Sequence, residues 1–446
     1  MNPSTSQPIP PPGPQRLLPH LWSYFRRPLQ CYQELATRHG QPFSVPFPLG
    51  GRMAVSGCPA HIGRIFKGGQ GLYRSVDTNA GVFYGEHSLV ALDGEAHARL
   101  RRLLMVPVLR QPSSAAKLMQ AAALRAFAAR SAGERFDMLD KARVITLDVI
   151  IAAVFGVLGE HEHKEFVEAI HGLQGSIGFF AVFIKALRRD LGAWSPWGRY
   201  IRARAKCYAL IEARMAAVRR ALNDDDSSVL ALWVRLRDSS GQPALTDAEI
   251  RDNLLTLLFA GHDSTAVALT WCMYWVHREP GVLLALLDEL QGYAKTLDVG
   301  LLGQTPYLDA VCQESLRVHP VAPGIARRLD KAMDLGDFTV PAGDVVMACI
   351  DLASYEPDLF SEPHRFRPER FIGRNYEHNE FIPFGGGERR CLGANMAFAE
   401  MRFVLATLVC QHRFRLTEKR PVLPAWSHGI RRPATGVRMI LEGPRI

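Results

Sequence analysis

One helix of unusual length is predicted between Thr246 and Glu279. Thr246 and Glu249 have the T-x-x-E spacing of a capping box, which marks a helix start, and Pro280 ends the helical pattern. At 1.5 Å per residue this helix would be roughly 50 Å long, enough to cross a whole domain. A helix of that length favours one large helical domain over several small ones.

The rest of the chain predicts a mainly α fold with small β-sheets. Long amphipathic patterns fill residues 95–295, whereas the short apolar runs 43–47 and 53–55 are typical of strands. Residues 335–350 predict a hairpin that turns at 341–343. A last helix is expected just after Cys391.

The domain organisation is expected to be simple. Residues 1–15 are rich in proline and predict an extended N-terminal arm. The Gly-, Ser- and Asp-rich interruptions further along are short and read as connections between helices. We therefore expect a single domain over residues 16–446.

Composition excludes several classes of protein. The 446 residues are 48% hydrophobic and 22% charged, which suffices for a large core. The 53 basic and 44 acidic residues give a net charge of +9 without a Lys or Arg block, so nucleic-acid binding is not expected. Eight cysteines without a C-x-x-C pair predict reduced thiols. With no signal-peptide pattern and no apolar run of about 20 residues, a cytoplasmic protein without a membrane anchor is expected.

Polar residues interrupt the apolar middle of the long helix. The stretch LLFAGHDSTAVAL places Gly261, His262, Asp263, Ser264 and Thr265 inside it. A glycine there costs about 1 kcal/mol relative to alanine, and polar groups that face a core must find partners. Either the helix is loosened around a bound group, or these residues face solvent.

A second helix carries a possible ion pair. It is predicted from Thr305, a candidate N-cap followed by Pro306, to its end at Pro320. Glu314 and Arg317 are three residues apart, so they share a face and can pair. Taken alone, such a pair is typical of an exposed helix surface.

The segment FIPFGGGERRCLGANMAFAE, residues 381–400, is the most informative for function. Three consecutive glycines let the backbone approach a flat body closely, and Arg389 supplies a fixed cation. Cys391 directly precedes a predicted helix, where the helix N-terminus and the arginines favour a thiolate, the form that binds metals. A buried structural cysteine is the alternative for Cys391 considered alone.

The pattern F-x-x-G-x-R-x-C-x-G, complete from Phe384 to Gly393, resembles the haem-binding loop of the cytochrome P450 family. Other segments resemble that family in order and spacing over residues 20–435. Glu314 and Arg317 match its E-x-x-R motif, and Arg370 matches the third member of its Glu/Arg/Arg network. AGHDST matches its oxygen-activating segment.

The resemblance implies a triangular helical prism around a buried haem b. Cys391 would be the axial thiolate of the iron, and the surrounding loop would supply Phe384, Gly385 and Gly393. The haem propionates would be held by four basic residues, with Arg328 as a substitute for its neighbour: His97, Arg101, Arg327 and Arg389.

The same resemblance assigns proton delivery to the polar segment of the long helix. Asp263 and Ser264 would relay protons to the bound oxygen, with Thr265 beside them. The family usually has threonine where Ser264 stands. Serine keeps the hydroxyl but lacks the methyl that limits rotation, so coupling of oxygen consumption to product is expected to be affected.

The substrate pocket is expected to be apolar. By family position it would be lined by Val82, Phe83, Phe180, Phe259, Ala260, Val321, Ile325 and Trp426. Such a pocket suits a hydrophobic small molecule such as a fatty acid, terpenoid, steroid or macrolide-like compound. Core packing is the alternative explanation for many of these side chains.

The resemblance implies a monomeric monooxygenase that uses O2. Because no flavin or nicotinamide fingerprint is present, electrons would come from a ferredoxin or flavodoxin with its NAD(P)H reductase. Two alternatives remain open: a haem-thiolate isomerase, dehydratase or peroxygenase, and a non-catalytic haem sensor. The Asp263 and Ser264 pair argues against the first, and the lack of a visible signalling domain argues against the second.

Overall fold

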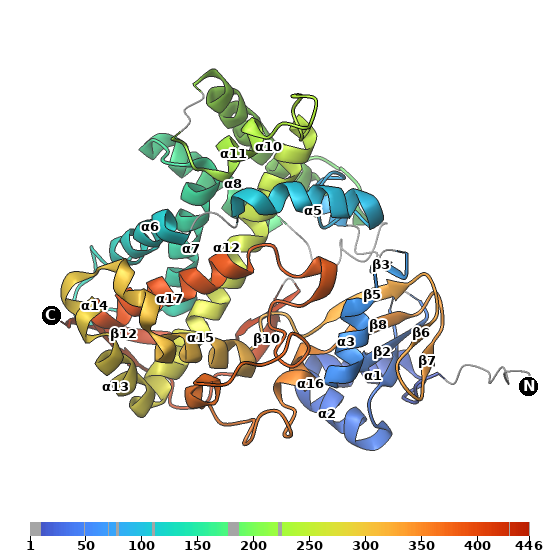
Figure 1. Ribbon diagram of the computed structural model, residues 1–446. Coiled ribbons are helices and arrows are strands. Elements are labelled where there is room, and N and C mark those ends of the chain that lie inside the picture. The colour runs from blue at the N-terminus through green and yellow to red at the C-terminus, as the bar shows by residue number, and fades with distance from the viewer. Residues whose placement is uncertain are drawn as a thin grey trace, which may run out of the picture.

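Helices dominate the computed structural model, which describes residues 10–48, 50–69, 71–76, 80–108, 112–176, 187–221, 225–427 and 429–445. Figure 1 shows the longer helices packed together away from a region that holds most of the strands. The helices are α1 (Leu17–Arg26), α2 (Pro28–His39), α3 (Pro59–Lys67), α4 (Ala80–Tyr84), α5 (Gly94–Val108), α6 (Pro112–Arg125), α7 (Met138–Phe155), α8 (Glu160–Ser176), α10 (Pro196–Arg220), α11 (Val229–Arg235), α12 (Asp247–Arg278), α13 (Pro280–Glu289), α14 (Gln291–Thr296), α15 (Pro306–Val318), α16 (Ile350–Ser354) and α17 (Ala394–Gln411), with 3-10 turns η2 (Val299–Gln304), η3 (Pro368–Phe371) and η4 (Gly387–Arg389).

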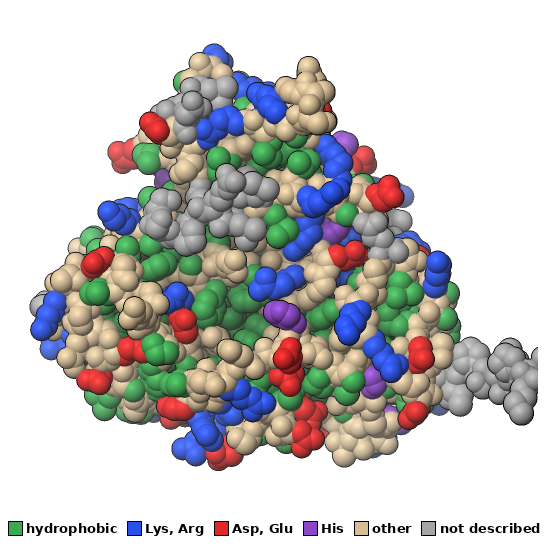
Figure 2. Space-filling view, in the orientation of Figure 1, with side chains coloured by type: hydrophobic (Ala, Val, Ile, Leu, Met, Phe, Trp, Pro, Cys, Tyr) green, Lys and Arg blue, Asp and Glu red, His purple; other side chains and the backbone are tan. Residues whose placement is uncertain are grey.

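The strands form four small sheets. They are β1 (Phe43–Pro46), β2 (Arg52–Ser56), β3 (Tyr73–Ser75), β4 (Arg135–Asp137), β5 (Ile325–Leu329), β6 (Met333–Asp334), β7 (Thr339–Val340), β8 (Val345–Ala348), β9 (His412–Leu416), β10 (Pro424–Ser427), β11 (Ile430–Pro433) and β12 (Arg438–Pro444). The largest sheet has the order β1-β2-β8-β5-β3, and the others are β4-β12-β9, β10-β11 and β6-β7. The outline of the molecule is roughly triangular (Figure 2). The predicted mainly α fold with small sheets is confirmed.

The long helix predicted from the capping box is α12. The Thr246 hydroxyl accepts a hydrogen bond from the Glu249 amide, and the Glu249 carboxylate accepts one from the Thr246 amide. The polar middle does not interrupt the helix, because Ser264 and Thr265 donate their hydroxyls to the carbonyls of Ala260 and Gly261 at 2.6 and 2.8 Å. Bonding back to the preceding turn gives both hydroxyl groups a partner, and α12 is continuous from Asp247 to Arg278.

The hairpin predicted over residues 335–350 is wrong. β7 pairs with β6 in a small ribbon of its own, while β8 enters the largest sheet between β2 and β5. All four residues of β8 are buried, and its sequence VVMA is apolar throughout, as a central strand requires. The predicted turn is real, with Gly343 at φ +88°, but it leads from one sheet into another.

α12 passes through two hydrophobic cores. Its first half, residues 250–258, packs with α7, α8, α10 and α11, whereas residues 266–276 pack with α7, α15 and α17. The polar segment 261–265 lies between these two stretches. The fold therefore places the chemistry-bearing part of α12 where its two cores meet.

No single helix within the described ranges is long and apolar enough to cross a membrane. α7 and α8 reach the required length and hydropathy only when taken together, across a bend of 116°. Most residues of α7 are buried inside the protein.

Candidate functional site

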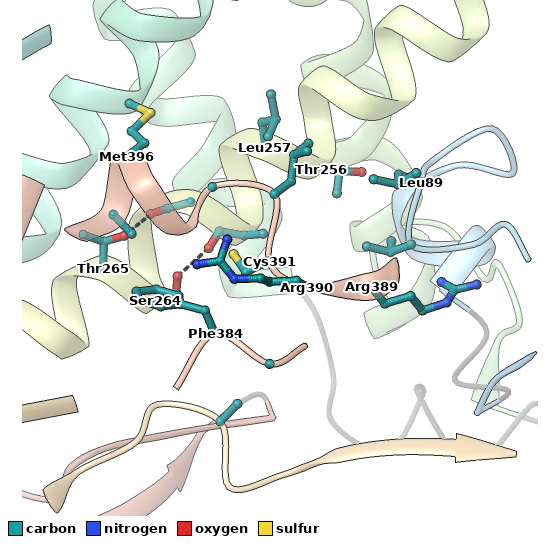
Figure 3. Close-up of a pocket in the computed structure, with 18 of the residues that line it drawn as sticks. Leu89, Thr256, Leu257, Ser264, Thr265, Phe384, Arg389, Arg390, Cys391 and Met396 are labelled. Atoms are coloured by element: carbon teal, nitrogen blue, oxygen red, sulfur yellow. Dashed lines mark hydrogen bonds between the residues drawn. The ribbon is translucent and has the colours of Figure 1, made fainter. Parts of the chain in front are cut away.

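A cavity of about 570 Å³ lies between α12 and the loop that precedes α17. Figure 3 shows residues of both segments around it, with Ser264 and Thr265 on α12 and Phe384 and Cys391 on the loop. The cavity wall contains thirteen of the residues predicted from the sequence: His97, Arg101, Ala260, Ser264, Thr265, Val321, Ile325, Arg327, Phe384, Gly385, Arg389, Cys391 and Gly393.

Cys391 differs from the other seven cysteines because its side chain is exposed, and it opens into this cavity. The backbone holds it in place: its amide donates to the Phe384 carbonyl at 3.0 Å. Partial enclosure raises the pKa of the thiol, while the Gly393 amide and the guanidinium groups of Arg390 and Arg101 act in the opposite direction. The surroundings thus contain the groups that stabilise a thiolate. The last helix begins at Ala394, three residues after Cys391.

The consecutive glycines of the loop are required by close contacts. Gly385 has φ +70°, and a Cβ atom there would lie 2.4 Å from Cδ1 of Ile325. Gly387 has φ +65°, and its Cβ would lie 2.6 Å from the Phe66 carbonyl oxygen. A side chain at Gly387 would clash with backbone, and the positive φ of both residues is strained for any residue other than glycine.

Four basic side chains converge on one part of the cavity. His97 and Arg101 lie one turn apart on α5, Arg327 lies on β5, and Arg389 lies in the loop. Burial and the neighbouring arginines lower the pKa of His97 to about 4, and burial and Arg389 lower that of Arg327 to about 10. The positive charges of the arginines therefore disfavour protonation of His97 and of Arg327.

These cations are only partly neutralised by the protein. Arg389 donates to the Leu92 carbonyl at 2.6 Å and pairs with Asp93, but its buried Nε has no partner among the described residues. Arg101 donates to the Arg390 carbonyl at 2.7 Å. Surplus positive charge of this kind favours an anionic ligand.

The two adjacent arginines of β5 lie on different sides. Arg327 lines the cavity, whereas Arg328 does not and instead donates to the Gly343 carbonyl at 2.5 Å. Its guanidinium lies over the Phe47 ring, 5.8 Å from the centroid. Arg327 is therefore the one available to a ligand in the cavity.

These residues fit a haem. One exposed thiol faces an apolar cavity, a glycine loop allows a flat ring to approach, and cations suited to two propionates lie at one side. Within the described ranges, no group of three or more His, Cys, Asp or Glu side chains could hold a bare metal ion. A porphyrin would bring metal ligands of its own, so a single thiolate from the protein could suffice to hold a haem iron here.

Asp263 does not line the cavity, in contrast to the expectation for a relay with Ser264. Its carboxylate accepts a hydrogen bond from Nε of Arg143 on α7 at 2.8 Å, and both side chains are largely covered. The pairing directs Asp263 toward α7, on another face of α12. Ser264 and Thr265 are thus the hydroxyl-bearing residues of this segment that line the cavity.

Glu314, Arg317 and Arg370 are brought together in a buried cluster outside the cavity. Glu314 and Arg317 form two contacts of 2.7 and 2.9 Å, and Nε of Arg370 lies 3.0 Å from the same carboxylate. Arg317 also donates to the carbonyls of Ser354 and Pro363. The exposed-surface interpretation of this pair is wrong, because both side chains of the pair are 0% exposed.

Several predicted pocket residues lie elsewhere. Phe83 packs against Trp197 and Tyr200, Phe259 contacts Tyr84, and Val82 packs beside the same core. Trp426 lies 5.9 Å from the ring of Tyr24 on α1. None of these four lines the cavity formed by the described residues, since each is turned toward a neighbouring aromatic group or core. Phe180 lies outside the described residues.

Several other residues of the cavity wall were not predicted from the sequence. The face of α12 that carries Ala260 and Ser264 continues at the helical spacing to Asn253, Thr256 and Ala268, which also line the cavity. That periodicity was available in the sequence. Glu400, a lone acid within an apolar stretch of α17, is a further cavity residue.

Comparisons with known proteins agree with this geometry. The family model for cytochrome P450 matches residues 9–438. Cytochrome P450 135B1 of Mycobacterium tuberculosis is 32% identical over 98% of this chain and 92% of its own length. Cytochrome P450 135A1 of the same species is also 32% identical, over 92% and 90%.

The solved structures give the same fold. A cyanobacterial cytochrome P450, CYP120A1 with retinoic acid bound, superposes with a TM-score of 0.80 at 24% identity and covers 98% of this chain and 99% of its own. Sequence match, architecture and the cysteine loop agree. The chain therefore belongs to the cytochrome P450 family.

Proposed function

We propose that this protein binds haem b through Cys391 and inserts one oxygen atom of O2 into a hydrophobic small molecule. Monooxygenase chemistry in general follows from membership of the family. The observation that carries the proposal for this chain is the exposed Cys391, which opens into an apolar cavity beside four basic side chains.

Different residues around the cavity would hold different parts of the haem. Cys391 would ligate the iron, with Phe384, Gly385 and Gly393 shaping the loop against the ring. His97, Arg101, Arg327 and Arg389 would neutralise the two propionates. When bound, a thiolate-ligated haem supplies the activation of dioxygen.

The protein must also manage protons and water. Ser264 and Thr265 offer hydroxyl groups to the cavity, and each is oriented by the carbonyl four residues earlier. Asp263 would act from the α7 side, where Arg143 holds its carboxylate. It can serve the cavity only by leaving that pair or by relaying a proton through the Ser264 hydroxyl.

The substrate would occupy the apolar part of the cavity. Ala260 of α12, Val321 before β5 and Ile325 at the start of β5 support a hydrophobic ligand such as a fatty acid, terpenoid, steroid or macrolide-like molecule. Apolar walls also exclude water from the reacting centre.

Electrons would come from a ferredoxin or flavodoxin with its NAD(P)H reductase. Arg102 and Arg390 are exposed, and the hydrogen bond from Arg101 to the Arg390 carbonyl joins α5 to the cysteine loop. A basic surface next to that loop suits an acidic electron carrier. All eight cysteines are free, which supports a reducing, cytoplasmic location.

The proposal is tested by ligand binding followed by turnover. Purified ferric protein is titrated with a diverse panel of hydrophobic ligands, and the tightest binders are incubated with NAD(P)H, with and without ferredoxin or flavodoxin and its reductase. We expect spectral shifts with apolar ligands and oxygenated product only when the partner is present. Product formed without any electron partner would contradict the partner assignment, and absence of product under all conditions would contradict the monooxygenase assignment.

A further inference from the structure

A buried ion pair joins α16 to β11 behind one wall of the cavity. Nη2 of Arg431 on β11 contacts the carboxylate of Asp351 on α16, and the two side chains are only 5% and 1% exposed. Neither residue is among the described residues that line the cavity. The pair therefore has no direct contact with a ligand there.

Each member of the pair stands next to a residue that does line the cavity. Ile350 precedes Asp351, and Ile430 precedes Arg431. Successive side chains of a strand point to opposite faces, so β11 directs Ile430 into the cavity and Arg431 away from it. The ion pair thus ties together two cavity residues from the side that faces the protein.

The same two residues hold the segment between α15 and β5. The Arg431 amide donates to the Val321 carbonyl at 2.9 Å, and the Asp351 amide donates to the Pro323 carbonyl at 3.1 Å. Val321 and the following Ala322 line the cavity. One ion pair therefore connects three stretches of the cavity wall that are far apart in the sequence.

Stability alone does not account for a charged pair at this depth. Burial raises the pKa of Asp351 to about 6 although Arg431 opposes this, so ionising the carboxyl costs more in the folded protein than in water. Nε of Arg431 has no hydrogen-bond partner among the described residues. Buried pairs of this kind contribute little net stability, whereas their directional contacts can fix one packing arrangement.

We propose that Asp351 and Arg431 are positioning residues, whose ion pair fixes the shape of one apolar wall of the cavity and thereby selects ligands by shape. That wall consists of Val321, Ala322, Ile350 and Ile430. In an apolar pocket, a mismatch of one methylene group changes discrimination roughly 10- to 200-fold. This inference rests on the proposed function, because it requires an apolar ligand in the cavity.

The test compares how imidazole and 1-dodecylimidazole bind to the haem-loaded ferric protein, by spectral titration. Imidazole reports on the iron alone, whereas the dodecyl chain must also fit the apolar walls, so the ratio of the two dissociation constants measures the fit. The double variant Asp351→Val with Arg431→Met replaces the pair by apolar side chains of similar volume. It should melt no lower than wild type, yet its relative affinity for 1-dodecylimidazole should fall about tenfold or more.

The matched control is the double variant Glu134→Val with Arg130→Met. It makes the same kind of exchange in a partly exposed ion pair, whose two residues are not among the described residues that line the cavity. Its ratio of dissociation constants should equal that of wild type. An unchanged ratio in the Asp351 and Arg431 variant, or an equal change in the control, would overturn the proposal.

A pH titration of the wild-type ratio replaces the variant if the variant folds poorly. Below a pH of about 6, protonation of Asp351 removes the negative charge opposite Arg431, so the relative affinity for 1-dodecylimidazole should fall from about pH 7 to about pH 5. Protonation of the free ligands cancels in the ratio, because both are imidazoles. A ratio that stays constant over this range would refute the proposed role of the pair.

Other groups around the pair should not titrate in this range. Burial raises the pKa of the tyrosines and of the thiol and lowers that of the histidine, so all of them stay neutral. These groups are Tyr24, Tyr32, Cys349, Tyr355 and His319. Arg317, the other charged group beside the histidine, is held by Glu314.

Turnover with the electron partner is measured on the same wild-type samples, so that the two proposals are judged separately. Absence of oxygenated product, with the expected change of the ratio present, would contradict the proposed function and leave the role of the ion pair standing. Product formed by wild type, with the ratio unchanged in the variant, would overturn the role of the ion pair alone.

Discussion

Two buried charged regions of this protein are built in opposite ways. In the Glu314 cluster, the carboxylate is shared by Arg317 and Arg370. Other guanidinium nitrogens of the same two arginines donate to backbone carbonyls. Around the cavity, Arg101, Arg327 and Arg389 lie near one another and near the neutral His97, and Asp93 pairs with Arg389. A satisfied cluster stabilises the fold, whereas a cluster with surplus charge is prepared for a ligand.

The largest expected effect is on the satisfied cluster. Glu314→Ala should lower the free energy of unfolding by about 3–5 kcal/mol, because it leaves two buried arginines uncompensated. The measurement is thermal or denaturant unfolding together with haem content. Asp334→Ala, which breaks the exposed Arg64–Asp334 pair, serves as control and should cost at most about 1 kcal/mol. Equal effects of the two substitutions would contradict the claim that the Glu314 cluster is a buried, stabilising network.

A substitution among the cavity arginines should have the opposite effect on stability and should instead weaken haem binding. Arg327→Gln should leave the apoprotein at least as stable as wild type, because it relieves repulsion with Arg389. Loss of a charge-assisted hydrogen bond of about 1.5–3 kcal/mol should weaken haem retention roughly 10- to 100-fold. Haem transfer to an acceptor protein measures this. Arg328→Gln is the matched control, and haem loss equal in both variants would contradict the assignment of Arg327.

The pH dependence of the apoprotein sharpens the same comparison. The folded pKa of His97, about 4, is lower than its ordinary value near 6.5, so the unfolded chain binds the proton more tightly. Stability should therefore fall as pH decreases from roughly 6.5 toward 4, with a slope of at most about 1.4 kcal/mol per pH unit from this residue. Denaturant titrations of wild type and His97→Gln measure it. If the free energy of unfolding depended on pH equally in wild type and His97→Gln, the lowered pKa of His97 would be contradicted.

The smallest effect is expected at Ser264. Ser264→Ala should leave folding, haem content and substrate binding intact while diverting electrons to peroxide, and Ser264→Thr should match or improve coupling. We expect a change of a few-fold, below the roughly 10²-fold or more of a sole proton-transfer group, because Thr265 also reaches the cavity. The measurement is the yield of peroxide and of product per electron pair. In the same assay, Asp263→Asn is expected to slow the whole cycle. Unchanged coupling in Ser264→Ala would assign the role to Thr265 or to solvent.

Local signals in the sequence predicted much of the fold and of the loop. The capping box and Pro280 defined α12, and the spacing from Phe384 to Gly393 identified the cysteine loop, because both depend on neighbouring residues only. The resemblance of the AGHDST segment, and not its helical period, singled out Ser264 and Thr265, and both residues line the cavity.

Contacts between distant residues could not be predicted in this way. Asp263 is turned away from the cavity by Arg143, 120 residues earlier in the chain. β8 leaves its expected hairpin because it pairs with β2, nearly 300 residues away. Phe83 lies outside the cavity wall because Trp197 and Tyr200 cover it. Each outcome depends on tertiary packing that no local pattern encodes.

The central claim is that the exposed Cys391 is the haem ligand, and the reduced carbon-monoxide spectrum tests it most directly. Wild type should show the band of a thiolate-ligated haem, and Cys391→Ser should lose it, because a hydroxyl is a far poorer ligand. Cys58→Ser, which alters a half-buried cysteine at the start of α3, should keep the band. An unchanged band in Cys391→Ser would contradict the account.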